Sequence, residues 1–119
     1  MNTINSELYT NNIKMVFNDR VELLKINSKI YAPAIVIVGV LNVTKRDAQF
    51  NVDFQQMVFL KGNSKITITS NSTYFNEYLV VSEGFIEHKG TKYFDIKTIV
   101  ETIGGQLLEN NNEINILLE

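Results

Sequence analysis

Apolar positions near the end of the chain follow the period of an α-helix. The spacing i, i+3, i+4 and i+7 is occupied by Ile96, Ile99, Val100 and Ile103. Asp95 stands at the N-cap position, where a carboxylate can accept hydrogen bonds from the free N–H groups of the first turn. Gly104 and Gly105 provide the left-handed residue with which helices commonly end. The pattern therefore predicts one helix between these two signals.

Other parts of the chain alternate between apolar and polar residues, as strands do. After the helix, Leu107 and the positions 114, 116 and 118 predict a hairpin closed by the three asparagines at 110–112. In the middle of the chain, β-rich stretches are separated by short turns typical of hairpins. These turns are Lys61-Gly62-Asn63-Ser64, Asn76-Glu77 and Lys89-Gly90.

The segment from Ala32 to Val43 fits two structures. Its core, residues 35–38, has the β-branched composition of a buried strand. Pro33 favours a helix instead, because proline suits the first turn of a helix and is excluded from central strands. Such a helix, from Pro33 to about Asp47, would be apolar on nearly all sides and would need to be buried by this domain or by a second protomer. Homodimerisation is therefore a hypothesis.

The two halves of the chain match each other in order. Phe17-Asn18-Asp19 parallels Phe75-Asn76-Glu77, and residues 29–33 parallel residues 91–95. Ile37 and Leu41 then fall where Ile99 and Ile103 fall. This order predicts two degenerate β-hairpin–helix–β-hairpin repeats, at about residues 13–60 and 64–118, and it favours the helix at Pro33. Residues 1–12 are polar, and we expect them to form a flexible segment before a single domain of residues 13–119.

With this repeat in view, the chain resembles the copper amine oxidase N-terminal-like domain, or stalk domain, of secreted Gram-positive proteins. The family repeat reads approximately "VNG", "NGRTYVPLR", "EALGA", "KVEWD" and "KTVTI". In this chain Lys89-Gly90-Thr91-Lys92-Tyr93 stands at the second of these motifs, and Glu101-Thr102-Ile103-Gly104-Gly105 stands at the third. The first half keeps Tyr31-Ala32-Pro33 for "YVP". The resemblance spans residues 13–118, although Trp is absent and Asp95 replaces the usual proline.

The resemblance implies an α+β fold in which an antiparallel sheet curls around helices. It does not imply amine oxidation, because in those enzymes the copper and its quinone-forming tyrosine belong to a different domain. The chain's own composition points the same way, since a single His cannot supply the three imidazoles of such a centre.

Composition narrows the function classes further. The 119 residues are 45% hydrophobic and 20% charged, which is typical of one globular domain. Without Cys there are no disulfides, thiolate metal ligands or cysteine nucleophiles. A net charge of −2 with scattered lysines lacks the basic stripe that nucleic acids require. The longest apolar run, residues 32–43, is too short and too interrupted to insert into a membrane.

No catalytic, cofactor-binding or metal-binding residues are predicted. His88 is the one candidate base, but its neighbour Glu87 should point to the opposite face of a strand, so we interpret it as a turn histidine. The remaining candidates are predicted to form interaction surfaces. Tyrosine combines a rigid apolar ring with a polar tip, and an all-apolar helix has more apolar surface than one core covers. These candidates are Tyr9, Tyr74, Tyr78, Ile35 and Val38.

Three functional hypotheses follow. The first is a non-catalytic, stalk-like binding or spacer module of an exported bacterial protein, secreted or at the cell surface, with a protein or cell-wall ligand. The alternative is a complete small cytoplasmic protein, phage- or mobile-element-encoded, that inhibits or scaffolds a protein partner. The third, an enzyme working through His88, is kept as a test of the non-enzymatic interpretation.

Overall fold

The protein is built on a central antiparallel sheet of five strands in the order β1-β4-β5-β12-β11. The computed structural model describes residues 2–18 and 20–119. The central strands are β1 (Asn2–Ile4), β4 (Leu23–Ile26), β5 (Lys29–Pro33), β12 (Thr91–Asp95) and β11 (Ile86–His88). At the middle of the sheet, β5 and β12 pair with Ala32 opposite Phe94.

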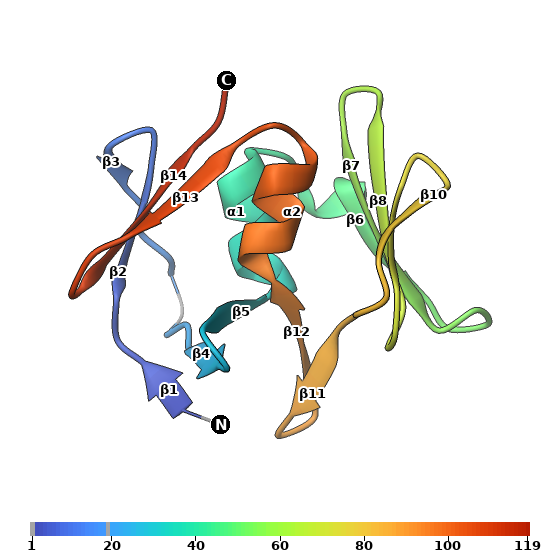
Figure 1. Cartoon of the computed structure of the whole chain (residues 1–119), viewed down its shortest axis with the longest axis horizontal. Coiled ribbons are helices and arrows are strands. Elements are labelled where there is room, and N and C mark those ends of the chain that lie inside the picture. Colours follow the sequence, from blue (N-terminus) through green and yellow to red (C-terminus); the bar gives the residue numbers. More distant parts are fainter. Residues whose placement is uncertain (1, 19) are drawn as a thin grey trace.

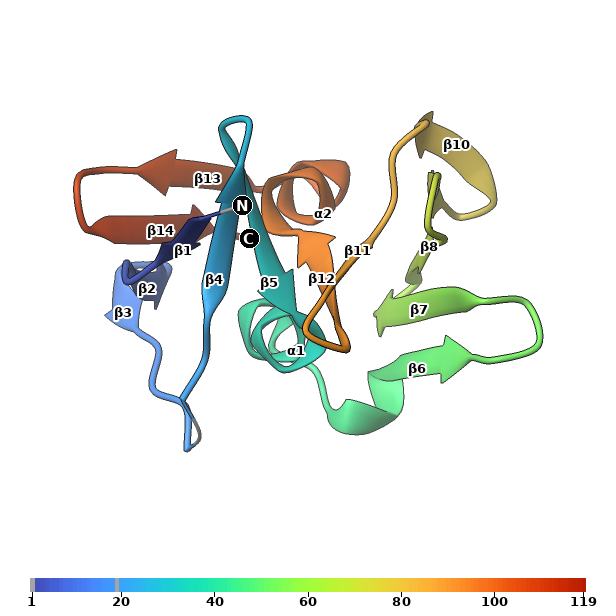
Figure 2. The ribbon, with the colours of Figure 1, turned by 90° about the horizontal axis from the view of Figure 1, so that it is seen from below.

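Two outer sheets flank this central sheet (Figures 1 and 2). One is an antiparallel meander of β6 (Ala48–Asn51), β7 (Gln56–Lys61), β8 (Ser64–Ile68), β9 (Thr73–Phe75) and β10 (Tyr78–Val81). The other has the order β13-β14-β2-β3, made of β13 (Gln106–Glu109), β14 (Glu113–Leu117), β2 (Glu7–Thr10) and β3 (Ile13–Lys14). In this second sheet β14 and β2 run parallel, whereas the other neighbours are antiparallel.

Two short helices lie between the outer sheets, so the α+β class with antiparallel strands curled around helices is confirmed (Figure 1). Each helix directly follows a central strand: α1 (Ala34–Leu41) follows β5, and α2 (Ile96–Thr102) follows β12. The predicted helix at residues 96–103 is confirmed, and the Asp95 side chain accepts a hydrogen bond from the Thr98 N–H at its start. Within the described residues, neither helix has the length and apolarity needed to cross a bilayer.

The first helix is shorter than predicted. Pro33 does mark its beginning, so the ambiguous segment is a helix rather than a strand. It ends at Leu41 instead of near Asp47, because Asn42 adopts the left-handed conformation of a C-cap, with φ 56°. Thr44 and Asp47 then form a capping box that begins a separate 3-10 turn, η1 (Lys45–Asp47).

The predicted hairpin turns in the middle of the chain are confirmed. Gly62-Asn63 joins β7 to β8, Asn76-Glu77 joins β9 to β10, and Lys89-Gly90 joins β11 to β12. Asn76 and Glu77 both have positive φ, at 47° and 75°, as a type I′ turn requires. The predicted hairpin of residues 106–118 is β13–β14.

The beginning of the chain differs from the sequence prediction. Residues 2–12 were expected to be flexible, yet they contain β1 and β2, and Leu8 is buried where it pairs with Ile114. The turn between β2 and β3 is formed by the two asparagines at 11–12, both with positive φ. Met1 and Asp19 lie outside the described residues.

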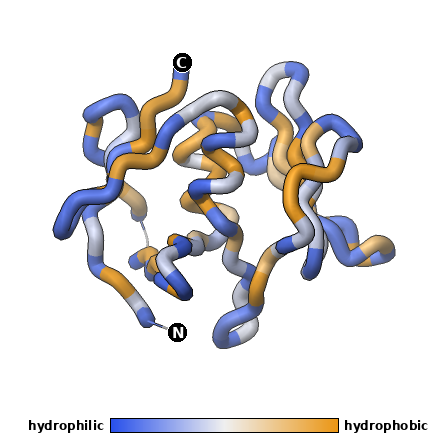
Figure 3. The backbone as a smooth tube through the Cα atoms, viewed as in Figure 1, coloured by the Kyte–Doolittle hydropathy of each residue, from blue (hydrophilic) through white to orange (hydrophobic). Residues whose placement is uncertain are grey.

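One hydrophobic cluster joins the helices to all three sheets. Apolar stretches follow the helices and the strands that face them, whereas most hairpin tips are hydrophilic (Figure 3). At its centre the rings of Phe59 and Phe94 meet edge to face, with centroids 5.2 Å apart. A second, smaller cluster of Leu24, Tyr31 and Tyr93 lies in the central sheet.

Candidate binding groove

A surface groove of about 680 Å³ runs along the outer side of α1. One wall is the helix itself, through Ala34, Ile35 and Val38. The opposite wall is the connection between β3 and β4, of which residues 15–18 and 20–22 are described. We call this depression the α1 groove.

The composition of α1 explains why one wall of the groove is apolar. The helix has no charged or hydrogen-bonding side chain, and five of its eight residues are buried against the core. Ile35 lies off that buried face and is 47% exposed, while Val38, one turn later, is 9% exposed at the groove's base. The helix therefore has more apolar surface than the core covers.

A glycine lets the β3–β4 connection approach the helix. A Cβ atom at Gly39 would lie 2.9 Å from Met15 Cε and 3.3 Å from Phe17 Cε1. Because such distances are shorter than normal carbon contacts, a larger residue at position 39 would push these two side chains outward. Gly39 thus fixes how closely the groove's two walls meet.

The described residues that line the α1 groove carry charge of one sign. Among the described residues that line it, Arg20 and Lys45 are cationic and none is acidic. The ion pairs formed by described residues all join a lysine to a glutamate, and neither Arg20 nor Lys45 takes part in them. Both residues are exposed to solvent, and neither forms an ion pair with another described residue.

The structure brings together two of the five residues predicted for an interaction surface. Ile35 and Val38 share the α1 groove. Tyr74 and Tyr78 lie in the meander sheet, where Tyr78 is 80% exposed, and Tyr9 lies in β2 of the other outer sheet. The Tyr9 hydroxyl donates to Glu7 Oε2 at 3.0 Å, and this hydrogen bond raises the pKa of the tyrosine. The tyrosines therefore do not form one surface with the helix residues.

His88 and its neighbour Glu87 make separate contacts in the β11–β12 hairpin. The His88 ring packs edge to face on Tyr93, with centroids 6.0 Å apart. Glu87 points elsewhere and pairs with Lys92, their Oε1 and Nζ atoms being 3.4 Å apart. No group of three or more His, Cys, Asp or Glu side chains that could hold a metal ion occurs among the described residues.

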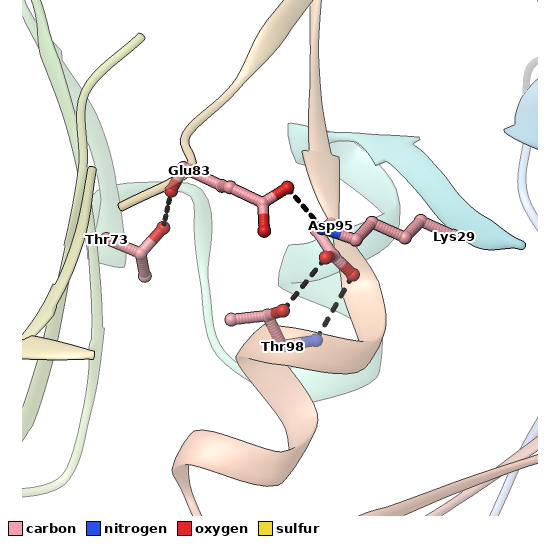
Figure 4. A network of polar contacts seen from close by, with 5 residues as sticks. All are labelled: Lys29, Thr73, Glu83, Asp95 and Thr98. Atoms are coloured by element: carbon pink, nitrogen blue, oxygen red, sulfur yellow. Dashed lines mark hydrogen bonds and ion pairs between the residues drawn. The ribbon is translucent and has the colours of Figure 1, made fainter. Parts of the chain in front are cut away.

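A polar network joins the central sheet to the meander sheet (Figure 4). Lys29 forms an ion pair with Glu83, and this contact raises the pKa of the lysine. The Glu83 carbonyl accepts a hydrogen bond from Thr73 Oγ1 at 2.8 Å. Asp95 accepts from Thr98 Oγ1 at 2.8 Å as well as from its N–H. Each of the two carboxylates is therefore already engaged in holding an element in place.

Tyr31 lies beside this network and is buried. Its burial raises the pKa of the phenol, and the nearby carboxylate of Asp95 raises it further. The phenol is thus held in its neutral form, which suits a packing residue of the central sheet better than a proton carrier.

Comparisons of the chain with protein-family models, with curated proteins and with solved structures give no match. The resemblance drawn from the sequence therefore stays a prediction, and the function has to be argued from the groove and the fold.

Proposed function

We propose that the protein is a non-catalytic, stalk-like binding module that holds a partner in the α1 groove. The observation that carries this proposal is the exposed apolar wall of α1 in a groove that also holds two cations, neither of which forms an ion pair with a described residue. An apolar surface of this kind is typical of interaction sites rather than of solvated faces.

The pairing of β5 with β12 supports the proposed repeat. Ala32 and Phe94, which match each other in the two halves, lie directly opposite one another. Tyr31 faces Asp95, and the matching Tyr93 faces Pro33. Such a register is what a two-fold relation between residues 13–60 and 64–118 would produce, with its axis between Ala32 and Phe94.

The outer sheets support the same relation. After each helix comes a hairpin, β6–β7 or β13–β14. The first shares its sheet with the hairpin β9–β10 of the second half, and the second shares its sheet with the hairpin β2–β3, of which β2 lies before residue 13. The meander sheet departs from the relation by one additional strand, β8, between β7 and β9. The arrangement supports a degenerate repeat of the kind that the stalk-domain resemblance implies.

The absence of catalysis is also part of the proposal. The Glu83 carboxylate pairs with Lys29, the Asp95 carboxylate caps α2, and His88 packs on a tyrosine ring. We expect the His88→Ala variant to remain folded and to lose only that ring contact within the domain. A turnover that disappears in His88→Ala, while the protein remains folded, would overturn this part of the proposal.

Photo-crosslinking in source cells tests the binding role. A photoreactive benzoylphenylalanine in place of Ile35 should yield an adduct of defined mass with a partner. The matched control carries the same residue in place of Lys97, which is exposed on α2. Equal labelling at both positions, or none at position 35, would contradict binding through the groove.

We further propose that the module works in an exported protein, at the cell surface or in the medium. Fractionation of source cells with intact-mass measurement tests this. A longer species in the envelope or medium supports it, whereas a 13.6 kDa species in the cytosol would favour the alternative of a small cytoplasmic protein that inhibits or scaffolds a partner. Both settings would use the same groove.

A further inference from the structure

The α1 groove continues into two neighbouring depressions. One, of about 290 Å³, lies toward β1 and β2, and the other, of about 380 Å³, lies toward the β11–β12 hairpin. Arg20 and Val21 line all three. The combined path is longer than a single side chain requires and is open to solvent along its length, a shape suited to an extended peptide.

The described residues along this path carry mainly positive charge. Lys45 lies in the α1 groove, Arg20 lies where the three depressions meet, and Lys89 lies in the depression beside the hairpin. Glu22 is the one acidic residue among the described residues that line the path. This local excess of cations contrasts with the chain's net charge of −2.

Apolar surface lies between the cations. Ile35 lines both the α1 groove and the depression by the hairpin, and Val16, on the opposite wall of the α1 groove, is 85% exposed. An apolar side chain placed between these two residues would remove carbon surface from water on both sides. Its flanking residues would then lie near Arg20 and Lys45.

From this arrangement we propose that the groove binds an acidic peptide segment of a partner protein, with an apolar residue on Ile35 and carboxylates at Arg20 and Lys45. The inference rests on the proposed binding function and specifies its ligand. Electrostatic complementarity of this kind sets which partner is accepted and speeds its association. A fatty acid fits less well, because an alkyl chain gains most from an enclosed tunnel and this path is open.

Fluorescence anisotropy with the purified full chain tests the proposal. The probe is a fluorescein-labelled peptide, Glu-Glu-Leu-Glu-Leu-Glu-Glu, and we expect saturable binding that weakens as salt is added. Peptides with Lys in place of each Glu, or Ser in place of each Leu, should bind far less. Equal binding of the lysine peptide would overturn the proposal.

Two substitutions with the same net charge change locate the site. Lys45→Glu should weaken binding by roughly fivefold, because an exposed ion pair is replaced by a repulsion of similar size. Lys97→Glu, on α2, should leave it unchanged. Ile35→Ser should weaken it through the lost apolar contact. Equal loss in the two charge variants would mean that only the net charge matters, which would also overturn the proposal.

Other occupants give different results. Binding to phosphatidylglycerol vesicles, lost in Lys45→Glu while the peptide does not bind, would assign the groove to a membrane. A mass from light scattering of about twice 13.6 kDa, which falls to the monomer mass in Ile35→Ser, would assign the groove to a second copy of this chain. Either result overturns the acidic-peptide proposal. An adduct at position 35 in cells without peptide binding would reject the ligand class and leave the binding function standing.

Discussion

The two helices have equivalent places in the fold but opposite outer faces. Both follow a central strand, and both bury isoleucines in the same core. The outer side of α2 carries Lys97 and Glu101, which are exposed and solvated. The outer side of α1 carries Ile35 and lies beneath the β3–β4 connection. The outer face of α2 shows that a helix in this place does not need an apolar outer face, whereas the β3–β4 connection covers the outer face of α1 only in part and leaves Ile35 47% exposed.

The helices also begin differently. The first turn of α2 is held by the Asp95 side chain, whereas Pro33 provides no side-chain hydrogen bond at the start of α1. Proline supplies instead a backbone already set for the first turn. The stability of α1 therefore depends more on packing, and that of α2 more on its cap.

The largest expected effect comes from substitutions on the buried face, which both helices have. Ile37 and Ile99 are almost completely buried, at 0% and 1% exposed. Replacing either with Ala should lower the free energy of unfolding by about 2–5 kcal/mol, because a cavity is left in the core. Urea titration measures this, with Lys97→Ala as a control that should change stability by less than about 0.5 kcal/mol. A much smaller loss at position 37 would show that α1 packs less tightly than α2.

The next largest effect on stability is expected at the N-cap of α2. Asp95→Ala should cost about 1 kcal/mol, because the N–H of Thr98 loses its acceptor at the start of α2. Asp95→Asn should retain most of that stability, since asparagine caps helices about as well as aspartate. Equal unfolding midpoints in wild type and Asp95→Ala would contradict a dependence of α2 on its cap.

A third test uses Tyr31 and Tyr93, which occupy matching positions in the two halves. Burial raises the pKa of both phenols above the ordinary value of 10.0. Because each proton is held more tightly in the folded state, their contribution is complete below that pH and is lost as the pH rises through the folded pKa.

The midpoint of unfolding should therefore decrease as the pH rises above 10, the ordinary pKa of tyrosine. The pKa of Lys29 is also raised and adds a loss of the same sign. The informative comparison is thus wild type against the Tyr31→Phe, Tyr93→Phe double variant, whose decline should be shallower. Identical declines in the two proteins would show that burial of the phenols has no effect on stability.

The smallest effect on stability is expected from substitutions on the outer faces of the two helices. Ile35→Ser should lower the unfolding free energy by no more than about 1 kcal/mol, because half of the side chain is already in water. Lys97→Ser should change it by even less. Peptide anisotropy should then separate the two variants, with binding weakened in Ile35→Ser alone. If both variants bind alike, the apolar outer face of α1 has no binding role.

Most of the sheet structure could be predicted because its signals are local. Two-residue turns such as Asn76-Glu77 and Lys89-Gly90 fix both the hairpin and its register. The helix α2 carries its own start and stop signals. The end of α1 was misplaced because Val43 continues the apolar pattern, while Asn42, which terminates the helix, is only a weak stop signal in a sequence.

The strands β1, β2 and β3 could not be predicted because their stability comes from distant residues. Leu8 is the one buried residue in a polar stretch, and its partner in the sheet is Ile114. A local window contains neither that partner nor the parallel pairing. The side chains at 11 and 12 likewise look like free polar residues until they bond to the C-terminal strand.

Only part of the α1 groove could be predicted from the sequence. Ile35 and Val38 were found because an all-apolar helix has more surface than one core needs. Arg20 and Lys45 were not found, because a sequence does not show which loop lies against which helix. Gly39 was the available signal: an isolated glycine within a helix often marks the close approach of another segment.

The parallel pairing of β2 with β14 also determines when the protein can fold. The Leu118 N–H donates to Asn11 Oδ1 at 2.9 Å across 107 residues of sequence. During synthesis β2 leaves the ribosome before β14 and remains without this partner until Glu113–Leu117 has emerged. The closing of this outer sheet therefore has a high contact order, which makes it a slow step and leaves the edge of β2 open to chaperones meanwhile.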